Sequence, residues 1–286
     1  MTRSSRGRWL AALALVPTLG PLAATAQEAD ETALIHWAYA ATFGSGVYEL
    51  GESSEALVVR APFALRLRTA DATKRCNCGL KLLLPVTVGV QDFDIDALLA
   101  GDFPRRVEQV SFLPGVEIEL PRSDRWTLRV RAQVGWGTEL GGDHDSAWIY
   151  AAGIRSRLMW PERKLRPAWI IGIQSTGYDA EHFERQSLAR LTNAVELDIG
   201  VPRWEFREEP MRLMPYVLND QFVDSVHIFS VVDEAIDDLD SEWEIGVAAG
   251  RARPFSIFGI EFDRVGLGFR FSEESRGIRF VFGSIF

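Results

Sequence analysis

The sequence predicts an all-β protein that forms a single antiparallel transmembrane β-barrel of about twelve strands, of the outer-membrane type. Three observations lead to this fold class. Apolar residues recur at every second position through most of the chain, the alternating segments are long, and the chain ends on an aromatic residue, Phe286. Side chains of a strand point alternately to opposite faces, so this period marks strands with one apolar face. In a barrel of this type the apolar face meets lipid.

The composition limits the protein classes that fit. Of the 286 residues, 47% are hydrophobic and 25% are charged, which excludes a disordered chain. The net charge of −9 argues against a nucleic-acid binder that neutralises phosphates. Beyond the N-terminus no apolar run reaches the roughly 18–20 residues of a membrane-spanning helix, so a helical membrane protein is excluded.

Residues 1–26 have the features of a signal peptide, which leaves 27–286 as the barrel domain. Three arginines precede an apolar stretch over 9–16, and Ala24-Thr25-Ala26 offers small residues where a signal peptidase cuts. A membrane anchor is the alternative, but Pro17 and further breakers interrupt the stretch. We therefore expect export and location in the bacterial outer membrane.

The clearest predicted strand covers 126–136. Every second residue from Trp126 to Trp136 is apolar, and the residues between them are polar or small. An average strand of a soluble protein has about 5–6 residues, whereas a tilted transmembrane strand has about 9–11. Tryptophan at both ends fits the aromatic girdles at the two membrane surfaces.

Eleven further segments show a similar alternation, less cleanly in places. They are 34–48, 57–67, 80–90, 110–120, 148–158, 167–177, 187–200, 211–223, 241–251, 256–271 and 277–286. Asn193 and Asp220 fall on apolar faces, and the parity breaks near Asp263-Arg264, where a bulge is expected. The segment 34–48 fits a strand or a short N-terminal helix, and both assignments are open. An even strand number returns the chain to the periplasmic side.

The last strand carries a predicted assembly signal. Ile278, Phe280, Phe282 and Phe286 share one face. This pattern resembles the C-terminal strand of outer-membrane barrels, whose terminal aromatic residue is read by the barrel-assembly machinery. We expect this machinery, outer-membrane lipid and lipopolysaccharide as partners, and no nucleic acid.

Short turns are expected to bring charged inward residues together in the periplasmic half of the interior. This predicted belt consists of Glu117, Glu119, Arg129, Arg131, Arg155, Arg157, Glu196, Asp198 and Arg212. Within it, Glu196 and Asp198 are expected to face Arg212 across a turn over 201–210. Twelve strands lie between the eight that side chains fill and the sixteen that leave a channel. The belt is therefore either a constriction that selects small polar or charged solutes, or a salt-bridge lattice that fills the barrel without flux.

Two other clusters of polar residues are expected to carry no cofactor. Cys76 and Cys78 would close a strained ring and lack the second half of a zinc site, so a turn is expected, with a labile disulfide as the alternative. The acidic stretch 232–244 is expected to be a solvated outer loop, with cation binding as the alternative.

An enzyme is not predicted. None of the histidines is flanked, at strand spacing, by both a nucleophilic serine and an orienting amide. The alternative is a surface hydrolase, a protease or a lipase, in which the aspartate–histidine pair of 143–145 would activate water. The four histidines are His36, His144, His182 and His227.

Three motifs and the terminal Phe286 carry a resemblance to a known family. The motifs are Ala-Ala-Thr-Phe-Gly-Ser-Gly-Val-Tyr at 40–48, Val-Arg-Ala-Pro-Phe at 59–63 and Leu-Leu-Pro-Val-Thr-Val-Gly at 83–89. With them, the mature chain resembles the solitary outer-membrane autotransporter-type β-barrel domain family. The resemblance implies a twelve-stranded, translocator-like barrel. About seven residues separate Ala26 from Leu34, which leaves no passenger to secrete. We therefore expect a structural barrel or a restricted passive pore, with a translocator for a separate partner as the alternative.

Overall fold

The computed structural model describes 44–50, 54–70, 78–91, 109–140, 146–180, 183–206, 209–226, 239–257, 260–273 and 275–283. The described residues all belong to one compact unit, Thr32–Phe286. Residues 1–31 lie outside the described residues, and so do Cys76, Phe286 and the four histidines. The described residues form an all-β fold.

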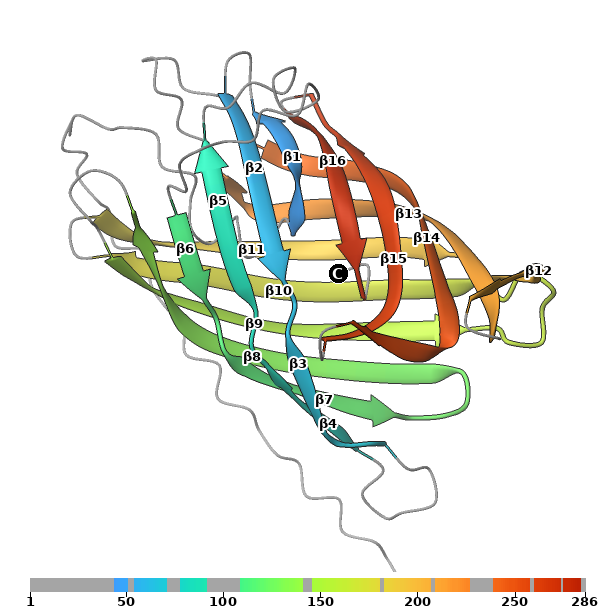
Figure 1. Ribbon diagram of the computed structural model, residues 1–286. Helices are drawn as coiled ribbons and strands as arrows, with labels where there is room; N and C mark the ends of the chain where they lie inside the picture. Colours follow the sequence, from blue (N-terminus) through green and yellow to red (C-terminus); the bar gives the residue numbers. More distant parts are fainter. Residues whose placement is uncertain are drawn as a thin grey trace, which may run out of the picture. The chain divides into compact units, whose positions relative to one another are not determined.

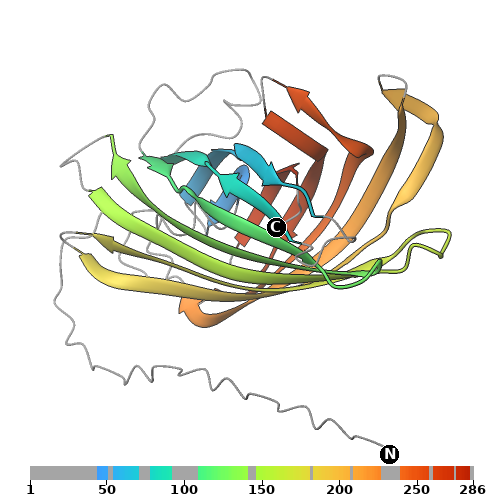
Figure 2. The same cartoon turned by 90° about the horizontal axis from the view of Figure 1, so that it is seen from below.

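Sixteen β-segments form one antiparallel sheet that closes on itself as a twelve-stranded barrel (Figures 1 and 2). The segments are β1 (Ser45–Leu50), β2 (Ser54–Ala61), β3 (Ala64–Arg68), β4 (Gly79–Leu83), β5 (Val86–Gln91), β6 (Gln109–Phe112), β7 (Gly115–Pro121), β8 (Trp126–Glu139), β9 (Ser146–Met159), β10 (Ala168–Ala180), β11 (Phe183–Glu196), β12 (Ile199–Phe206), β13 (Glu209–Val226), β14 (Leu239–Ile257), β15 (Ile260–Phe271) and β16 (Ser275–Phe282). Within the described ranges, no helix has the length and apolar character needed to cross a membrane.

Four of the twelve barrel strands consist of two segments each: β2 with β3, β4 with β5, β6 with β7, and β11 with β12. The two segments of each strand pair with the same neighbouring strand on either side of a short break. The breaks lie at Pro62-Phe63, Leu84-Pro85, Leu113-Pro114 and Leu197-Asp198. Proline has no N–H to donate to the ladder, which explains three of the four breaks. The predicted all-β barrel of about twelve strands is confirmed.

The three proline breaks lie side by side across neighbouring strands and bend the sheet. In Figure 1 the direction of the chain changes between β6 and β7. Gly135 lies opposite the third break, where a Cβ atom would come within 2.0 Å of the Phe112 carbonyl oxygen. Backbone hydrogen bonds connect the breaks: Leu84 N donates to Phe63 O (2.8 Å), Leu113 N to Pro85 O (3.2 Å) and Val134 N to Pro114 O (3.0 Å).

The first and last strands close the barrel. β1 pairs antiparallel with β16, from Ser45 opposite Phe280 to Leu50 opposite Ser275. The same strand β1 pairs with β2 on its other side. Closure removes an edge that would otherwise leave backbone N–H and C=O groups without partners.

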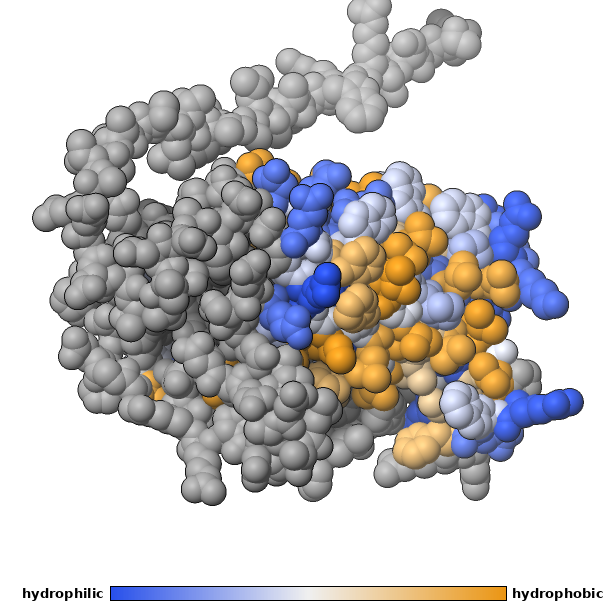
Figure 3. All heavy atoms as spheres, turned by 90° about the horizontal axis from the view of Figure 1, so that it is seen from above, coloured by the Kyte–Doolittle hydropathy of each residue, from blue (hydrophilic) through white to orange (hydrophobic). Residues whose placement is uncertain are grey.

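The barrel wall is apolar outside and largely polar inside. In β16 the buried residues Ser275, Gly277, Arg279 and Val281 alternate with exposed ones. Figure 3 shows apolar side chains gathered on the outer surface. A soluble protein would bury most of these side chains, so the distribution is inverted. The exposed apolar residues include Val59, Val134, Trp148, Ile154, Ile173, Val195, Val217, Ile245, Leu267, Phe269, Ile278, Phe280 and Phe282.

The described part of the first predicted strand, 34–48, is a strand. Residues 45–48 belong to β1, and 34–43 lie outside the described residues. At the other end of the chain, 277–282 form most of β16.

The prediction of a solvated outer loop over 232–244 is wrong for its second half. β14 begins at Leu239, and its inward residues Glu242 and Glu244 are buried. The two carboxylates alternate with exposed residues, so they belong to the period-two pattern of a strand. Residues 232–238 lie outside the described ranges.

The three predicted irregularities have different outcomes. Asp220 lies on the inward face of β13 and is 1% exposed, so its assignment to the outward apolar face is wrong. Asn193 does lie on the exposed face of β11, where its Oδ1 accepts a hydrogen bond from Trp169 Nε1 at 2.8 Å. The register shift expected near Asp263 is present, with its additional residues in β14, between Gly250 and Phe255.

Candidate functional site

The interior of the barrel is the candidate site because most of the buried charges gather there. Arg270 on β15 contacts three carboxylates from two other strands. Its Nη2, Nη1 and Nε atoms donate to Asp220 Oδ2 at 2.9 Å, Glu242 Oε2 at 2.9 Å and Glu244 Oε2 at 2.8 Å. All four side chains are at most 2% exposed.

Two further arginines complete this group. Arg190 Nη1 lies 3.0 Å from Asp220 Oδ2, and Arg279 Nη2 lies 2.7 Å from Glu244 Oε1. We call Arg190, Asp220, Glu242, Glu244, Arg270 and Arg279 the Arg270 cluster. Its three cations balance its three anions. Balance matters because a buried charge without a partner carries a large desolvation cost.

Neutral donors also form hydrogen bonds with the carboxylates of the Arg270 cluster. Ser275 Oγ donates to Glu242 Oε1 at 2.6 Å, Tyr216 OH donates to Glu244 Oε1, and Thr192 Oγ1 donates to Asp220 Oδ1. These residues come from β11, β13 and β16. The cluster and its donors therefore connect the five consecutive barrel strands from β11 to β16, which stiffens this part of the wall.

Two glycines, Gly246 and Gly268, leave space for Tyr216, which donates a hydrogen bond to Glu244 of the Arg270 cluster. Tyr216 lies opposite Gly246 in the register of β13 and β14. A Cβ atom at Gly246 would lie 2.4 Å from Tyr216 Cζ, and one at Gly268 would lie 2.5 Å from the hydroxyl oxygen. The ring therefore occupies space that a side chain on the adjacent strands would need.

The predicted belt lies on inward positions of the wall, and the structure joins several of its members. Register pairs Glu117 with Arg131 and Glu119 with Arg129. Arg129 Nη2 forms an ion pair with Glu119 Oε2 at 2.9 Å. Arg155 Nη2 lies 4.0 Å from Glu117 Oε2, and Lys81 Nζ lies 3.4 Å from Glu117 Oε1.

The remaining members of the belt form pairs that differ in part from the prediction. Arg212 forms two hydrogen bonds with the Asp198 carboxylate, as the expected position across the β12–β13 turn requires. Glu196 does not pair with Arg212. Its two oxygens contact Arg157, at 2.9 Å, and Arg264. Arg157 is two strands away, and Arg264 comes from β15, so strand order along the chain did not reveal these pairs.

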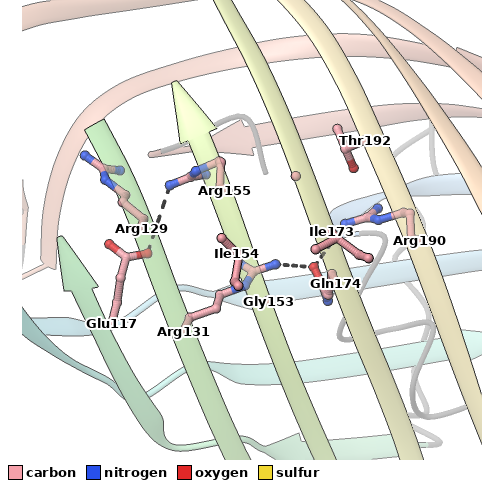
Figure 4. A pocket seen from close by; sticks show the side chains of 11 residues that line it. Glu117, Arg129, Arg131, Gly153, Ile154, Arg155, Ile173, Gln174, Arg190 and Thr192 are labelled. Carbon is pink, nitrogen blue, oxygen red and sulfur yellow. Dashed lines mark hydrogen bonds and ion pairs between the residues drawn. The ribbon is translucent and has the colours of Figure 1, made fainter. Parts of the chain in front are cut away.

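A small cavity is lined by several members of the belt and by Arg190 of the Arg270 cluster (Figure 4). Its volume is about 30 Å³, which leaves room for about two water molecules. The side chains of Arg131 and Gln174 meet there (Figure 4). The lining residues are Glu117, Arg129, Arg131, Gly153, Ile154, Arg155, Gly172, Ile173, Gln174, Arg190 and Thr192.

None of the six residues of the Arg270 cluster is predicted as a site from the sequence. The sequence pattern places Glu242 and Glu244 in a loop and Asp220 on the wrong face. A signal was present, because Arg270 and Arg279 occupy the same parity as the small residues Gly268 and Gly277. Charged residues that alternate with exposed apolar ones mark the inner face of a transmembrane barrel strand.

A metal site is not evident in the part of the chain that the structure describes, where no three histidine, cysteine or acidic residues are grouped to hold an ion. Cys78 is buried, and its Sγ accepts a hydrogen bond from Arg68 Nη2 at 2.7 Å. Because Cys76 lies outside the described residues, the expected turn and its alternative disulfide are untested.

Comparison with protein-family models, with curated proteins and with solved structures finds no match for this chain. The resemblance to the autotransporter-type barrel family therefore stays a prediction from the sequence motifs.

Proposed function

We propose that this protein is an integral β-barrel of the bacterial outer membrane, with a structural role, whose interior ion pairs hold the wall together and obstruct the lumen. The observation that carries the proposal is the inverted wall. Bulky apolar side chains on the outer face are about half exposed, whereas the arginines and carboxylates of the Arg270 cluster are almost fully buried. Water outside the wall would make this distribution unfavourable, and lipid makes it favourable.

Exposed tryptophans support two interfacial girdles. Trp136 pairs with Trp148 near one end of the wall. Trp126 and Trp169 both lie opposite Leu158 near the other end. Ten residues separate Trp126 from Trp136 in β8, which gives about 33 Å along the strand. A strand tilt of about 35–45° reduces this length to roughly 23–27 Å, close to the apolar band of outer-membrane barrels.

The indole N–H groups of one girdle have polar partners on the outer face. Trp126 Nε1 donates to Ser156 Oγ at 2.9 Å, and Trp169 Nε1 donates to Asn193 Oδ1 at 2.8 Å. Buried or interfacial tryptophans generally need such an acceptor. The presence of Asn193 on an apolar face thus agrees with a position at the membrane surface.

The buried charges of the lumen favour a structural role over an open pore. The Arg270 cluster joins the strands from β11 to β16 with side chains that are nearly inaccessible to water. A freely conducting channel would keep such groups hydrated. A restricted passive pore for small polar solutes is the second candidate, and the arginine-lined cavity favours it.

Several expectations from the sequence belong to this proposal. They include the signal peptide over 1–26, contact with lipid and lipopolysaccharide, and recognition by the barrel-assembly machinery. Ile278, Phe280 and Phe282 are exposed on the outer face of β16, where another protein can reach them before insertion. The translocator and hydrolase alternatives gain no support from the described residues.

Insertion into lipid vesicles tests the proposal. We expect the purified mature chain to fold only when phosphatidylcholine vesicles or detergent micelles are present, and to migrate differently on gels before and after boiling. Protease should then leave the strands intact and cut connecting segments. Recovery of a monomeric, folded chain from buffer without amphiphile would contradict the proposal.

A further inference from the structure

We propose that the cavity between the belt and the Arg270 cluster is a binding site for one small inorganic oxyanion, such as phosphate or sulfate. The site lies inside the wall, and its existence does not depend on which membrane holds the barrel. Its central residues are Arg131 on β8, Arg155 on β9, Gln174 on β10 and Arg190 on β11. Four consecutive strands of the sheet therefore contribute to it.

The positive charge of Arg131 is not balanced by a carboxylate among the described residues. Its neighbours are paired: Lys81 and Arg155 contact Glu117, and Arg129 contacts Glu119. Arg190 contacts Asp220 within the Arg270 cluster. A buried cation without a carboxylate partner is unfavourable, and a bound anion relieves this cost.

A neutral group lies at the centre of the cavity. Arg131 Nη2 and Arg190 Nη2 both donate to the same oxygen, Gln174 Oε1, the latter at 3.2 Å. Gln174 Nε2 donates to Thr176 Oγ1 at 3.0 Å, which turns the amide oxygen towards the two guanidinium groups. An amide oxygen accepts hydrogen bonds but carries no charge to neutralise Arg131. Arg60 adds a further positive charge that interacts with Arg131.

The Arg270 cluster differs from this cavity in its charge balance. There, each arginine contacts at least one carboxylate, and cations and anions are equal in number. Arg131 instead donates a hydrogen bond to the amide oxygen of Gln174. The unbalanced charge thus coincides with the position where a cavity of about 30 Å³ remains open.

The chemistry of arginine selects the class of ligand. A guanidinium group presents a planar fork of N–H donors that matches the oxygens of phosphate, sulfate or carboxylate. Several such groups around one cavity favour a compact oxyanion, and the small volume excludes a nucleotide or a lipid headgroup with its glycerol. Chloride, which lacks this oxygen geometry, should bind more weakly.

The test measures thermal unfolding of the full-length mature protein, folded in detergent, in sodium phosphate, sodium sulfate or sodium chloride of equal ionic strength. A ligand that binds the folded state raises the unfolding temperature with concentration. We expect phosphate and sulfate to raise it more than chloride does. Equal effects of the three salts would contradict the proposal.

Two variants locate the site. Gln174→Glu places a carboxylate between Arg131 and Arg190 without a change in size. We expect it to unfold at a higher temperature than the unaltered protein without phosphate, and to bind phosphate at least about tenfold more weakly. Arg131→Gln should weaken phosphate binding by a similar factor.

The matched control is Arg212→Gln. This change also removes an inward arginine, but Arg212 contacts Asp198 and does not line the cavity. Phosphate affinity within about twofold of the unaltered protein is expected. Loss of phosphate binding in all three variants alike, or its retention in Gln174→Glu, would overturn the proposal. A Gln174→Glu chain that fails to fold would also contradict it, because the inference requires a carboxylate to be accommodated there.

Discussion

Asp220 and Arg270 are fifty positions apart in the sequence, and their side chains meet at 2.9 Å in the interior of the barrel. Each is 1% exposed. β14 lies between the strands that carry them, and it contributes Glu242 and Glu244 to the same arginine. The Arg270 cluster therefore ties together strands that the backbone ladder connects only pairwise.

Loss of one charge from the Arg270 cluster should destabilise the barrel strongly. Glu244 contacts both Arg270 and Arg279. We expect Glu244→Gln to lower the free energy of unfolding by about 3–5 kcal/mol, because buried Arg279 loses the carboxylate it contacts and buried Arg270 loses one of its three. Urea-induced unfolding in lipid vesicles, followed by tryptophan fluorescence, measures the change.

The matched control is the exposed ion pair in which Arg125 Nη2 lies 3.2 Å from Glu162 Oε1. Glu162→Gln should alter the free energy of unfolding by at most about 1 kcal/mol. Similar effects of Glu162→Gln and Glu244→Gln would show that burial of the cluster contributes little.

A charged side chain introduced on the outer face should destabilise the barrel strongly only in the middle of the apolar band. Ile154 is exposed and lies opposite Val130, near the middle of β8. We expect Ile154→Arg to destabilise the vesicle-inserted barrel by about 2–4 kcal/mol, and Leu158→Arg, at the tryptophan girdle, by about 0–1 kcal/mol. If water covered this face, neither change would have a sizeable cost. Unfolding titrations of both variants in the same vesicles distinguish the two situations.

A single methyl group added at Gly246, under the Tyr216 ring, should destabilise the barrel. Gly246→Ala brings Cβ within 2.4 Å of Tyr216 Cζ, so the ring and its hydrogen bond to Glu244 must shift. We expect a loss of about 1–3 kcal/mol in the free energy of unfolding. Gly200→Ala is the control, because nothing lies within 4 Å of its Cβ position. Equal stabilities of the two variants would contradict this account of Gly246.

Conductance measurements test the restricted pore against the obstructed barrel. In planar bilayers we expect the unaltered protein to show little or no conductance, because the charges of the Arg270 cluster are paired and buried across the lumen. Should small channels occur, they should favour anions, and replacement of Arg129 and Arg131 by glutamate should reverse the preference. Large, unselective channels in the unaltered protein would contradict an obstructed lumen.

Ion pairs across one short turn could be predicted from the sequence, whereas ion pairs across several strands could not. Asp198 and Arg212 flank a hairpin, so their contact follows from antiparallel pairing. Glu196 instead contacts Arg157 and Arg264, which are 39 and 68 residues away. Those contacts depend on the curvature of the wall across the interior, which no local pattern encodes.

The face of β13 shows why parity alone was insufficient. Met214, Tyr216 and Leu218 are buried inside the barrel, while Val217 and Val223 lie outside. Both faces are thus partly apolar, and hydropathy does not distinguish them. Burial of Asp220 by Arg270 and Arg190 identifies the inward face only once the neighbouring strands are in place.

The sequence by itself determined the strands, their number and, for most of them, the outward face, because alternation is a property of each strand alone. The tertiary structure decided which inward charges meet, where they balance, and where arginines surround a cavity with a neutral glutamine at its centre. The physical reason is that closure and strand tilt set the relative heights of side chains on different strands. A single strand carries no information about those heights.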